Sequence, residues 1–138
     1  MLDQEALLAE PAENYMSPAQ QGFFAGLLNT QRTALQAQID EQMNFLRGME
    51  AESDPADIGA AEEQRTWHLR MLAREKKLLD KIDAALSRIA RREYGWCSET
   101  GEPIGLKRLL LRPTASLCIE AKERQEKREQ HMIKSRGE

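Results

Sequence analysis

The stretch ESDPADIGA, at residues 52–60, decides how this chain folds. It gathers a proline, a glycine and three acidic residues, a composition that ends one helix and starts another. No proline lies between Pro18 and this stretch, and none lies between it and Arg92. Two long helical patterns joined by so short a break are expected to fold back on each other as an antiparallel hairpin.

Each of the two patterns carries an apolar stripe with coiled-coil spacing. We expect the first helix to run from Ser17-Pro18 to about Glu52, and the second from about Pro55 to Arg92. Steps of three, four and seven residues place the stripe on one face, and a helix of ~35 residues is roughly 50 Å long. The expected seam consists of Leu28, Leu35, Ile39, Leu46 and Met49 in the first helix and Leu69, Leu72, Leu79, Ile82, Leu86 and Ile89 in the second.

The regions outside the hairpin have a different texture. The acidic N-terminus, interrupted by Pro11, is expected to be a mobile or loosely docked segment. Residues 94–114 hold three glycines and two prolines, which indicate tight turns and a short β-hairpin, and residues 115–135 are helical again. The sequence therefore predicts a mainly α chain in three parts: an N-terminal segment (1–16), a coiled-coil hairpin (17–93) with its tip near 53–59, and a small body with a C-terminal helix (94–138).

The composition argues against several classes of protein. Hydrophobic residues make up 41%, charged residues 31% and aromatic residues 5%, which suits solvent-washed helices better than a thick core. A net charge of −3 argues against a basic coat for nucleic acid. No apolar run reaches the ~18 residues of a membrane span. Because the first 16 residues also lack the basic start and apolar run of a secretory signal, we expect a cytoplasmic protein with reduced cysteines.

Four positions in the body have the spacing of a zinc site from which two cysteines are missing. Cys97, Thr100, Cys118 and Ala121 fit C-x2-C-x17-C-x2-C, but alanine has no donor atom and a threonine hydroxyl is a poor zinc ligand. We therefore expect no structural zinc. Three interpretations of the two cysteines stay open: packed thiols, a redox pair, or a partial metal site. Packing is expected to hold the body through Trp96, Ile104, Leu106, Leu109, Leu110, Leu117, Cys118 and Ile119.

The charged residues at the tip and on the body have a local and a functional interpretation. Asp54 is a good N-cap, and Asp57 favours the positive end of the helix dipole. At the end of a long rod, the same carboxylates can reach cationic side chains or a bound Mg²⁺ in a deep site. Basic residues from three segments fit a phosphate-rich ligand or an acidic partner surface, unless they are merely solvated. They are Lys81, Lys107, Arg108, Arg112 and Lys122.

The sequence holds no sign of an enzyme. A glycine-rich phosphate loop is missing, and no nucleophile lies in a pattern with a base. His68 and His131 lie far from the cysteine positions, and we interpret both as surface residues of helices.

Three segments resemble the DksA/TraR family: DPAD at 54–57, REKKLLDKID at 74–83 and YGWCSETGEPIGLKRLLLRPTASLCIEAK at 94–122. Tyr15-Met16 and the helix that follows are also similar, so the resemblance runs from about residue 14 to 130. It implies a coiled-coil hairpin that projects from a small degenerate zinc-finger-like domain with a C-terminal helix. It further implies entry into the secondary channel of bacterial RNA polymerase, without direct DNA binding. Together with guanosine tetraphosphate (ppGpp), such a factor destabilises promoter open complexes, with negative control of rRNA promoters and positive control of some biosynthetic promoters.

The resemblance also implies roles for individual residues. Asp54, Asp57 and Gly59 match tip positions that act near the polymerase active site, and Gly59 replaces an alanine at a cost of up to ~1 kcal/mol to the helix start. Arg74 and Arg108 match positions that contact polymerase or hold the body against the hairpin. Positions at the ppGpp site between factor and polymerase are matched by Leu78, Lys81, Arg112 and Lys122. Since Thr100 and Ala121 depart from the family, we expect a zinc-independent paralogue that substitutes for a zinc-bearing form when zinc is scarce.

Two functions from other classes remain alternatives. A coiled-coil adaptor would use the seam between two chains and form a stable dimer, whereas the break at 53–55 favours a monomer with an intramolecular hairpin. A thiol redox sensor would depend on Cys97 and Cys118.

Overall fold

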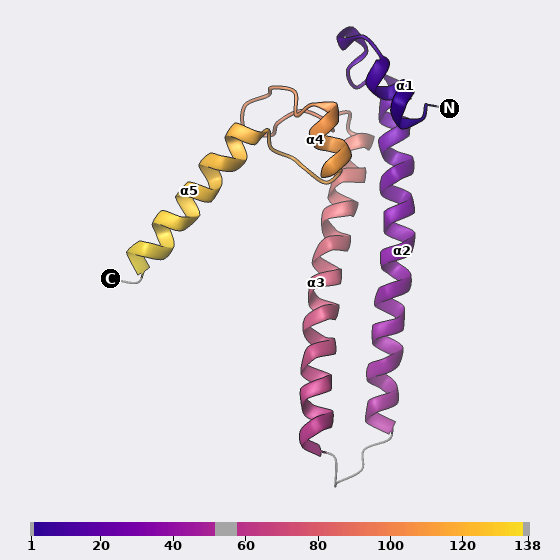
Figure 1. Cartoon of the computed structure of the whole chain (residues 1–138), viewed down its shortest axis with the longest axis vertical. Helices are drawn as coiled ribbons and strands as arrows, with labels where there is room; N and C mark the ends of the chain where they lie inside the picture. The colour runs from indigo at the N-terminus through magenta and orange to yellow at the C-terminus, as the bar shows by residue number, and fades with distance from the viewer. Residues whose placement is uncertain (1, 52–57, 137–138) are drawn as a thin grey trace. The chain divides into compact units, whose positions relative to one another are not determined.

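The computed structural model describes residues 2–51 and 58–136, and in these ranges it is built of helices and turns without a strand, which confirms the mainly α class (Figure 1). The chain divides into two compact units, Leu28–Asp83 and Met1–Leu27 together with Ala84–Glu138. The elements in chain order are α1 (Gln4–Ala9), the 3-10 helix η1 (Ala12–Asn14), α2 (Pro18–Ala51), α3 (Ile58–Ala90), α4 (Leu106–Leu111) and α5 (Ile119–Arg136).

Helices α2 and α3 form the hairpin that the sequence predicts, and Figure 1 shows them side by side and antiparallel. Helix α2 begins at Pro18, and the Ser17 hydroxyl accepts a hydrogen bond from the Gln20 amide (3.2 Å), as expected for an N-cap. The break itself, residues 52–57, lies outside the described residues. Helix α3 ends at Ala90, two residues before the expected Arg92, because Arg92 takes a left-handed backbone conformation with a φ of 61°.

The apolar seam of the Leu28–Asp83 unit largely follows the predicted stripe. Leu28, Leu35, Ile39 and Ile82 are buried. The prediction is wrong at Leu69, whose side chain is 46% exposed. The predicted Ile82 is buried and the predicted Leu72 and Leu79 are half-buried, but the seam of α3 also contains positions 68 and 75, which are polar and lie seven residues apart.

One exposed ion pair joins the two helices beside the seam, whereas a buried carboxylate within the seam has an unpaired oxygen within the described ranges. The Arg32 guanidinium donates to the Asp83 carboxylate at 2.6 Å. Glu75 lies in the seam, is only 7% exposed, and has an Oε2 atom without a hydrogen-bond partner among the described residues. The middle of the hairpin therefore buries a carboxylate oxygen without compensation.

The second unit is organised around Tyr94, which is 1% exposed. Its ring packs against Phe24 of α2 with 5.5 Å between the centroids, and its hydroxyl donates to the Pro113 carbonyl at 2.7 Å. Burial raises the pKa of the Tyr94 hydroxyl above its usual value. Arg88 of α3 adds a hydrogen bond to the Thr114 carbonyl (3.1 Å), so that residues 113–114 are fixed by two side chains.

The N-terminal segment differs from the mobile or loosely docked stretch that we expected. Asp3 caps α1 by accepting from the Ala6 amide at 2.7 Å, and Leu7 is fully buried. The Tyr15 hydroxyl donates to the Gly95 carbonyl (2.5 Å) and accepts from the Gly105 amide (2.9 Å). Gly95 has a φ of 91°, and a Cβ there would lie 2.5 Å from the sulfur of Met16, so this close approach requires glycine.

The short β-hairpin expected in residues 94–114 does not form. Only an isolated antiparallel bridge joins Trp96 and Pro103, because Pro103 has no amide hydrogen with which to extend a ladder. The following residues form α4, which the sequence did not indicate. Among the expected packing residues, Ile104, Leu109 and Cys118 are buried, whereas Trp96 and Ile119 are exposed (40% and 53%).

Candidate functional site

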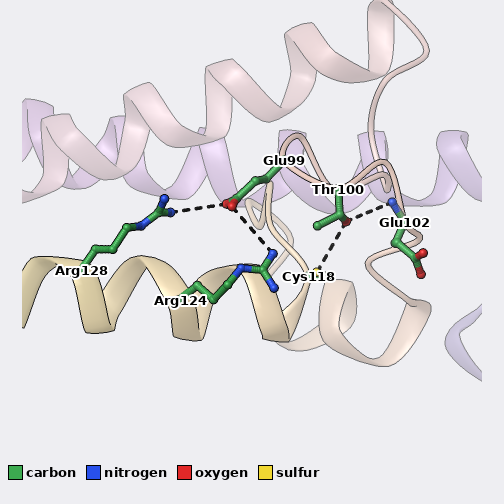
Figure 2. A network of polar contacts seen from close by, with 6 residues as sticks. All are labelled: Glu99, Thr100, Glu102, Cys118, Arg124 and Arg128. Carbon is green, nitrogen blue, oxygen red and sulfur yellow. Dashed lines mark hydrogen bonds and ion pairs between the residues drawn. The ribbon is translucent and has the colours of Figure 1, made fainter.

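The four zinc-ligand positions come together in a tight turn and the start of α5, as Figure 2 shows for two of them. The Thr100 hydroxyl lies 3.9 Å from the Cys118 sulfur and accepts a hydrogen bond from the Glu102 amide at 3.2 Å. The Cys97 amide donates to the Glu102 carbonyl (2.7 Å), which closes the turn. Ala121 is completely buried. The fold thus keeps the four positions of a zinc finger, but threonine and alanine occupy two of them.

These residues do not fit a zinc ion. The Ala121 methyl group occupies a ligand position without a donor atom, and the Thr100 hydroxyl is engaged with an amide and a thiol. Both cysteines are buried free thiols. Across the described part of the chain, no cluster of three or more His, Cys, Asp or Glu side chains is arranged to hold a metal.

Hydrogen bonds around Cys97 replace part of what a metal would do for a thiolate. Burial raises the pKa of the Cys97 thiol, but a hydrogen bond from Thr100 and bonds from the amides of Cys118, Thr100 and Glu99 outweigh it. The net result is a pKa lowered to about 6. Donors that stabilise a thiolate therefore persist in a turn that lacks two of the four ligands.

A carboxylate links the same turn to the C-terminal helix. Glu99 forms ion pairs with Arg124 and Arg128 of α5, each at 3.7 Å (Figure 2). All three side chains are largely in solvent, with 36%, 53% and 65% exposure, so these pairs contribute little to stability. Burial of Cys118, just before α5, and of Ala121, in its first turn, contributes more to holding this helix in place than the ion pairs do.

The tip residues are only partly described. Asp54 and Asp57 lie outside the described residues, so their proposed role stays a prediction. Gly59 is on the exposed first turn of α3, and a Cβ at this position would meet nothing within 4 Å. An alanine, the family's residue, would therefore fit there without strain.

The four positions matched to ppGpp belong to both units. Leu78, 43% exposed, and Lys81 lie on α3 in the Leu28–Asp83 unit. Arg112 and Lys122 lie in the other unit, at the end of α4 and on α5. Arg112 is exposed, and the Lys122 ammonium donates to the Gln125 side chain at 3.0 Å. Among the described residues, neither Lys81 nor Arg112 forms an ion pair.

The two arginines matched to polymerase or body contacts differ in surroundings. Arg74 is exposed on α3. The Arg108 guanidinium is half-buried and donates to the Leu117 carbonyl at 3.1 Å, so it holds α4 to the segment before α5. Lys107, the other cation of α4, points into solvent.

Sequence reasoning missed an aromatic group on the hairpin. His68, interpreted above as a surface residue, is half-buried, and its Nδ1–H donates to the side-chain Oε1 of Gln42 on α2. The ring of Phe45 of α2 packs at a tilt against the His68 ring, and Trp67 contacts His68 edge-on. Positions 68, 75 and 82 are spaced by seven residues, which indicates one face of a helix. Because the first two are polar, the apolar pattern did not identify them as buried. His131, by contrast, is exposed on α5 as expected.

The chain combines a long antiparallel helical pair with a small body that has four zinc-finger positions, two of them without cysteine. These features define a class of hairpin proteins with a degenerate zinc finger. The DnaK suppressor protein DksA N-terminal domain matches residues 20–89, and the prokaryotic dksA/traR C4-type zinc finger matches residues 92–127. The chain belongs to the DksA/TraR family, which confirms the resemblance seen in the sequence.

Individual relatives agree with this assignment. The RNA polymerase-binding transcription factor DksA of Escherichia coli K12 is 37% identical over 124 residues, which cover 89% of this chain and 82% of that protein. The protein of the same name from Caulobacter vibrioides NA1000 is 41% identical over 118 residues, 85% of this chain and 83% of the relative. The structure of transcription factor DksA2 from Pseudomonas aeruginosa matches with a TM-score of 0.87 and 64% identity, over 94% of this chain and all of that one.

No helix in the described ranges combines the length and apolar character required to cross a membrane.

Proposed function

We propose that this protein is a transcription regulator that binds bacterial RNA polymerase by inserting its hairpin into the secondary channel. The observation that carries the proposal is the antiparallel pair α2–α3 in a chain of the DksA/TraR family. Relatives at 37% and 41% identity are named RNA polymerase-binding transcription factors. The protein acts in the cytoplasm as a monomer, catalyses no reaction, and reaches promoters through polymerase without contacting DNA directly.

In this proposal the tip acts at the polymerase active site, and the basic residues bind ppGpp. Asp54 and Asp57 bring negative charge close to the polymerase active site and destabilise promoter open complexes, which lowers rRNA transcription and favours some biosynthetic promoters. The co-regulator ppGpp binds where factor and polymerase meet. Its phosphates pair with cationic side chains, and Leu78 supplies an apolar contact. The cations are Lys81, Arg112 and Lys122.

Zinc independence is the second part of the proposal. It is supported by the buried Ala121 methyl group and by the Thr100 hydroxyl, which leave two thiols where a closed zinc site needs four ligands. A body held by Tyr94, Leu109 and Ile104 keeps its shape when zinc is scarce. Such a protein serves cells in which the zinc-bearing relative has lost its metal.

Single-round transcription from an rRNA promoter tests both parts. Purified bacterial RNA polymerase is assayed with the full-length protein, with and without ppGpp, after treatment with a thiol-selective zinc chelator. We expect inhibition that survives the chelator and deepens with ppGpp. Absence of inhibition by a protein with an intact helical spectrum would refute the polymerase role, and a stable dimer in light scattering would then favour the coiled-coil adaptor.

Matched variants separate the residue roles. Asp54→Asn with Asp57→Asn is expected to bind polymerase but inhibit weakly. Leu78→Ala with Lys81→Ala is expected to lose the ppGpp effect, whereas changing the exposed Lys76 and Lys77 of the same helix to alanine keeps it. Replacing both cysteines by serine is expected to leave inhibition in place. Loss of function in that variant alone would favour a thiol redox sensor.

A further inference from the structure

The hairpin carries a tryptophan, Trp67, whose side chain lies more than half in solvent. Trp67 of α3 is 56% exposed, although tryptophan has the largest side chain to remove from water. It lies nine residues after Ile58, which begins α3, and this is about 14 Å along the axis at about 1.5 Å per residue. A large exposed aromatic side chain on a segment that enters a partner is a common centre of a binding surface.

The position of Trp67 is fixed by its neighbours before any partner arrives. The His68 ring contacts both Phe45 and Trp67, with centroid distances of 4.0 Å and 4.8 Å. The Trp67–His68 interplanar angle is 89°, and His68 is itself held by its hydrogen bond to Gln42. An aromatic side chain that is already ordered loses little conformational entropy on binding, so its contact area converts well into affinity.

Two carboxylates and one guanidinium line the hollow beside Trp67. A shallow hollow on α3 is lined by Glu62, Glu63, Thr66, Trp67 and Arg70, which share one face of the helix. Within the described part of the chain, neither Glu62 nor Glu63 has an ion-pair partner. Arg70 lies at the opposite end of the hollow from the two carboxylates, since it follows Trp67 in the helix while they precede it.

We propose that Trp67, Glu62 and Glu63 form a receptor for one cationic side chain, lysine or arginine, on the wall of the polymerase channel. The inference rests on the proposed function and names a contact within it. A cation over the indole face is attracted by the ring quadrupole, and the two carboxylates add charge complementarity at the same end of the hollow. A phosphate or nucleic-acid strand would be repelled by both carboxylates, and a purely apolar side chain would leave them without a partner.

The experiment is competition for bacterial RNA polymerase between fluorescently labelled parent protein and unlabelled full-length variants. We expect Trp67→Ala to bind about tenfold more weakly, which equals about 1.4 kcal/mol. Leu69→Ala is the matched control, because Leu69 is similarly exposed (46%) on the same helix but does not line the hollow. It should stay within about twofold of the parent, as expected for an exposed side chain outside the contact.

The chemistry of the partner is tested by changing the ring without changing its shape. In a Trp96→Phe background, Trp67 is the only tryptophan and can be replaced biosynthetically by mono- and difluorotryptophan. Fluorine weakens the negative face of the ring, so a cation predicts a stepwise loss of affinity. Glu62→Gln with Glu63→Gln should weaken binding further and reduce its dependence on salt.

Each outcome has a distinct meaning. Equal binding by Trp67→Ala and the parent overturns this inference and leaves the proposed function standing. A loss with Trp67→Ala but none with fluorination overturns the cationic partner. If the parent itself fails to bind polymerase, the proposed function fails, and the receptor fails with it. Thermal unfolding of each variant distinguishes a lost contact from a destabilised hairpin, and Trp67→Phe should recover part of the affinity if the contact is real.

Discussion

Replacing Glu75 by leucine should stabilise the hairpin. The side chain is 7% exposed, occupies a seam position of α3, and has an Oε2 atom without a partner among the described residues. Burying a polar group without a hydrogen bond costs about 1–3 kcal/mol in mutational data. Leucine has a similar size and removes this cost, so the free energy of unfolding should rise by about 1–3 kcal/mol. At about 4 °C per kcal/mol for a chain of this size, the Tm should rise by about 4–12 °C.

Thermal unfolding followed by circular dichroism measures the Tm, and hydrogen exchange of peptides from 28–51 and 58–83 locates the effect in the hairpin. Glu63→Leu is the control, because Glu63 is exposed on the same helix and its replacement should change stability by less than about 0.5 kcal/mol. A lower Tm for Glu75→Leu would refute the argument, since it would mean that the carboxylate has a stabilising partner. Light scattering is needed as well, because a buried polar residue in a seam can also prevent dimers.

Three further predictions concern the body. Thr100→Cys with Ala121→Cys should restore a four-thiolate site and bind one zinc ion per chain, measured by metal analysis after dialysis; no bound zinc would contradict the geometry of the degenerate site. Tyr94→Phe leaves the buried Pro113 carbonyl without its donor and should cost about 1–2 kcal/mol in urea unfolding, and an unchanged midpoint would show that the bond is unimportant. The pKa of Cys97 is lowered from 9.0 to about 6, so its ionisation stabilises the fold fully above pH 9, and this contribution is lost as the pH falls through about 6. The stability difference between the parent and Cys97→Ser should therefore shrink from pH 9 to pH 6, and a constant difference would contradict the pKa shift.

The hairpin could be predicted from sequence because its signals are local. Proline and acidic residues mark the break, and apolar spacing marks the seam at Leu28, Leu35, Ile39 and Ile82. The seam was misplaced at Leu69 because the spacing was judged from apolar residues alone. Two seam positions of α3 are occupied by His68 and Glu75, and a polar residue in a seam cannot be recognised from apolar spacing.

The body could be predicted only in part. The cysteine spacing identified Cys97, Thr100, Cys118 and Ala121, because a metal motif is a local pattern. The hydrogen bonds of the Tyr15 hydroxyl to Gly95 and Gly105 were not predictable, since these partners lie 80 and 90 residues away in the sequence. Helix α4 was missed for a related reason. Six residues are too few to form a stable helix alone, so α4 depends on tertiary packing such as the complete burial of Leu109.

The distance along the chain between the halves of the body has a consequence for how the protein folds during synthesis. One compact unit joins Met1–Leu27 to Ala84–Glu138, so its N-terminal half is made first and must wait for residues that follow the hairpin. Closing an open loop of that length costs entropy that grows with the logarithm of its length. The seam of the hairpin brings the two ends of the Leu28–Asp83 segment together, which shortens the loop that the contact between Phe24 and Tyr94 has to close. We therefore expect the hairpin to form before the body, so that weakening its seam slows assembly of the body more than it destabilises the body once formed.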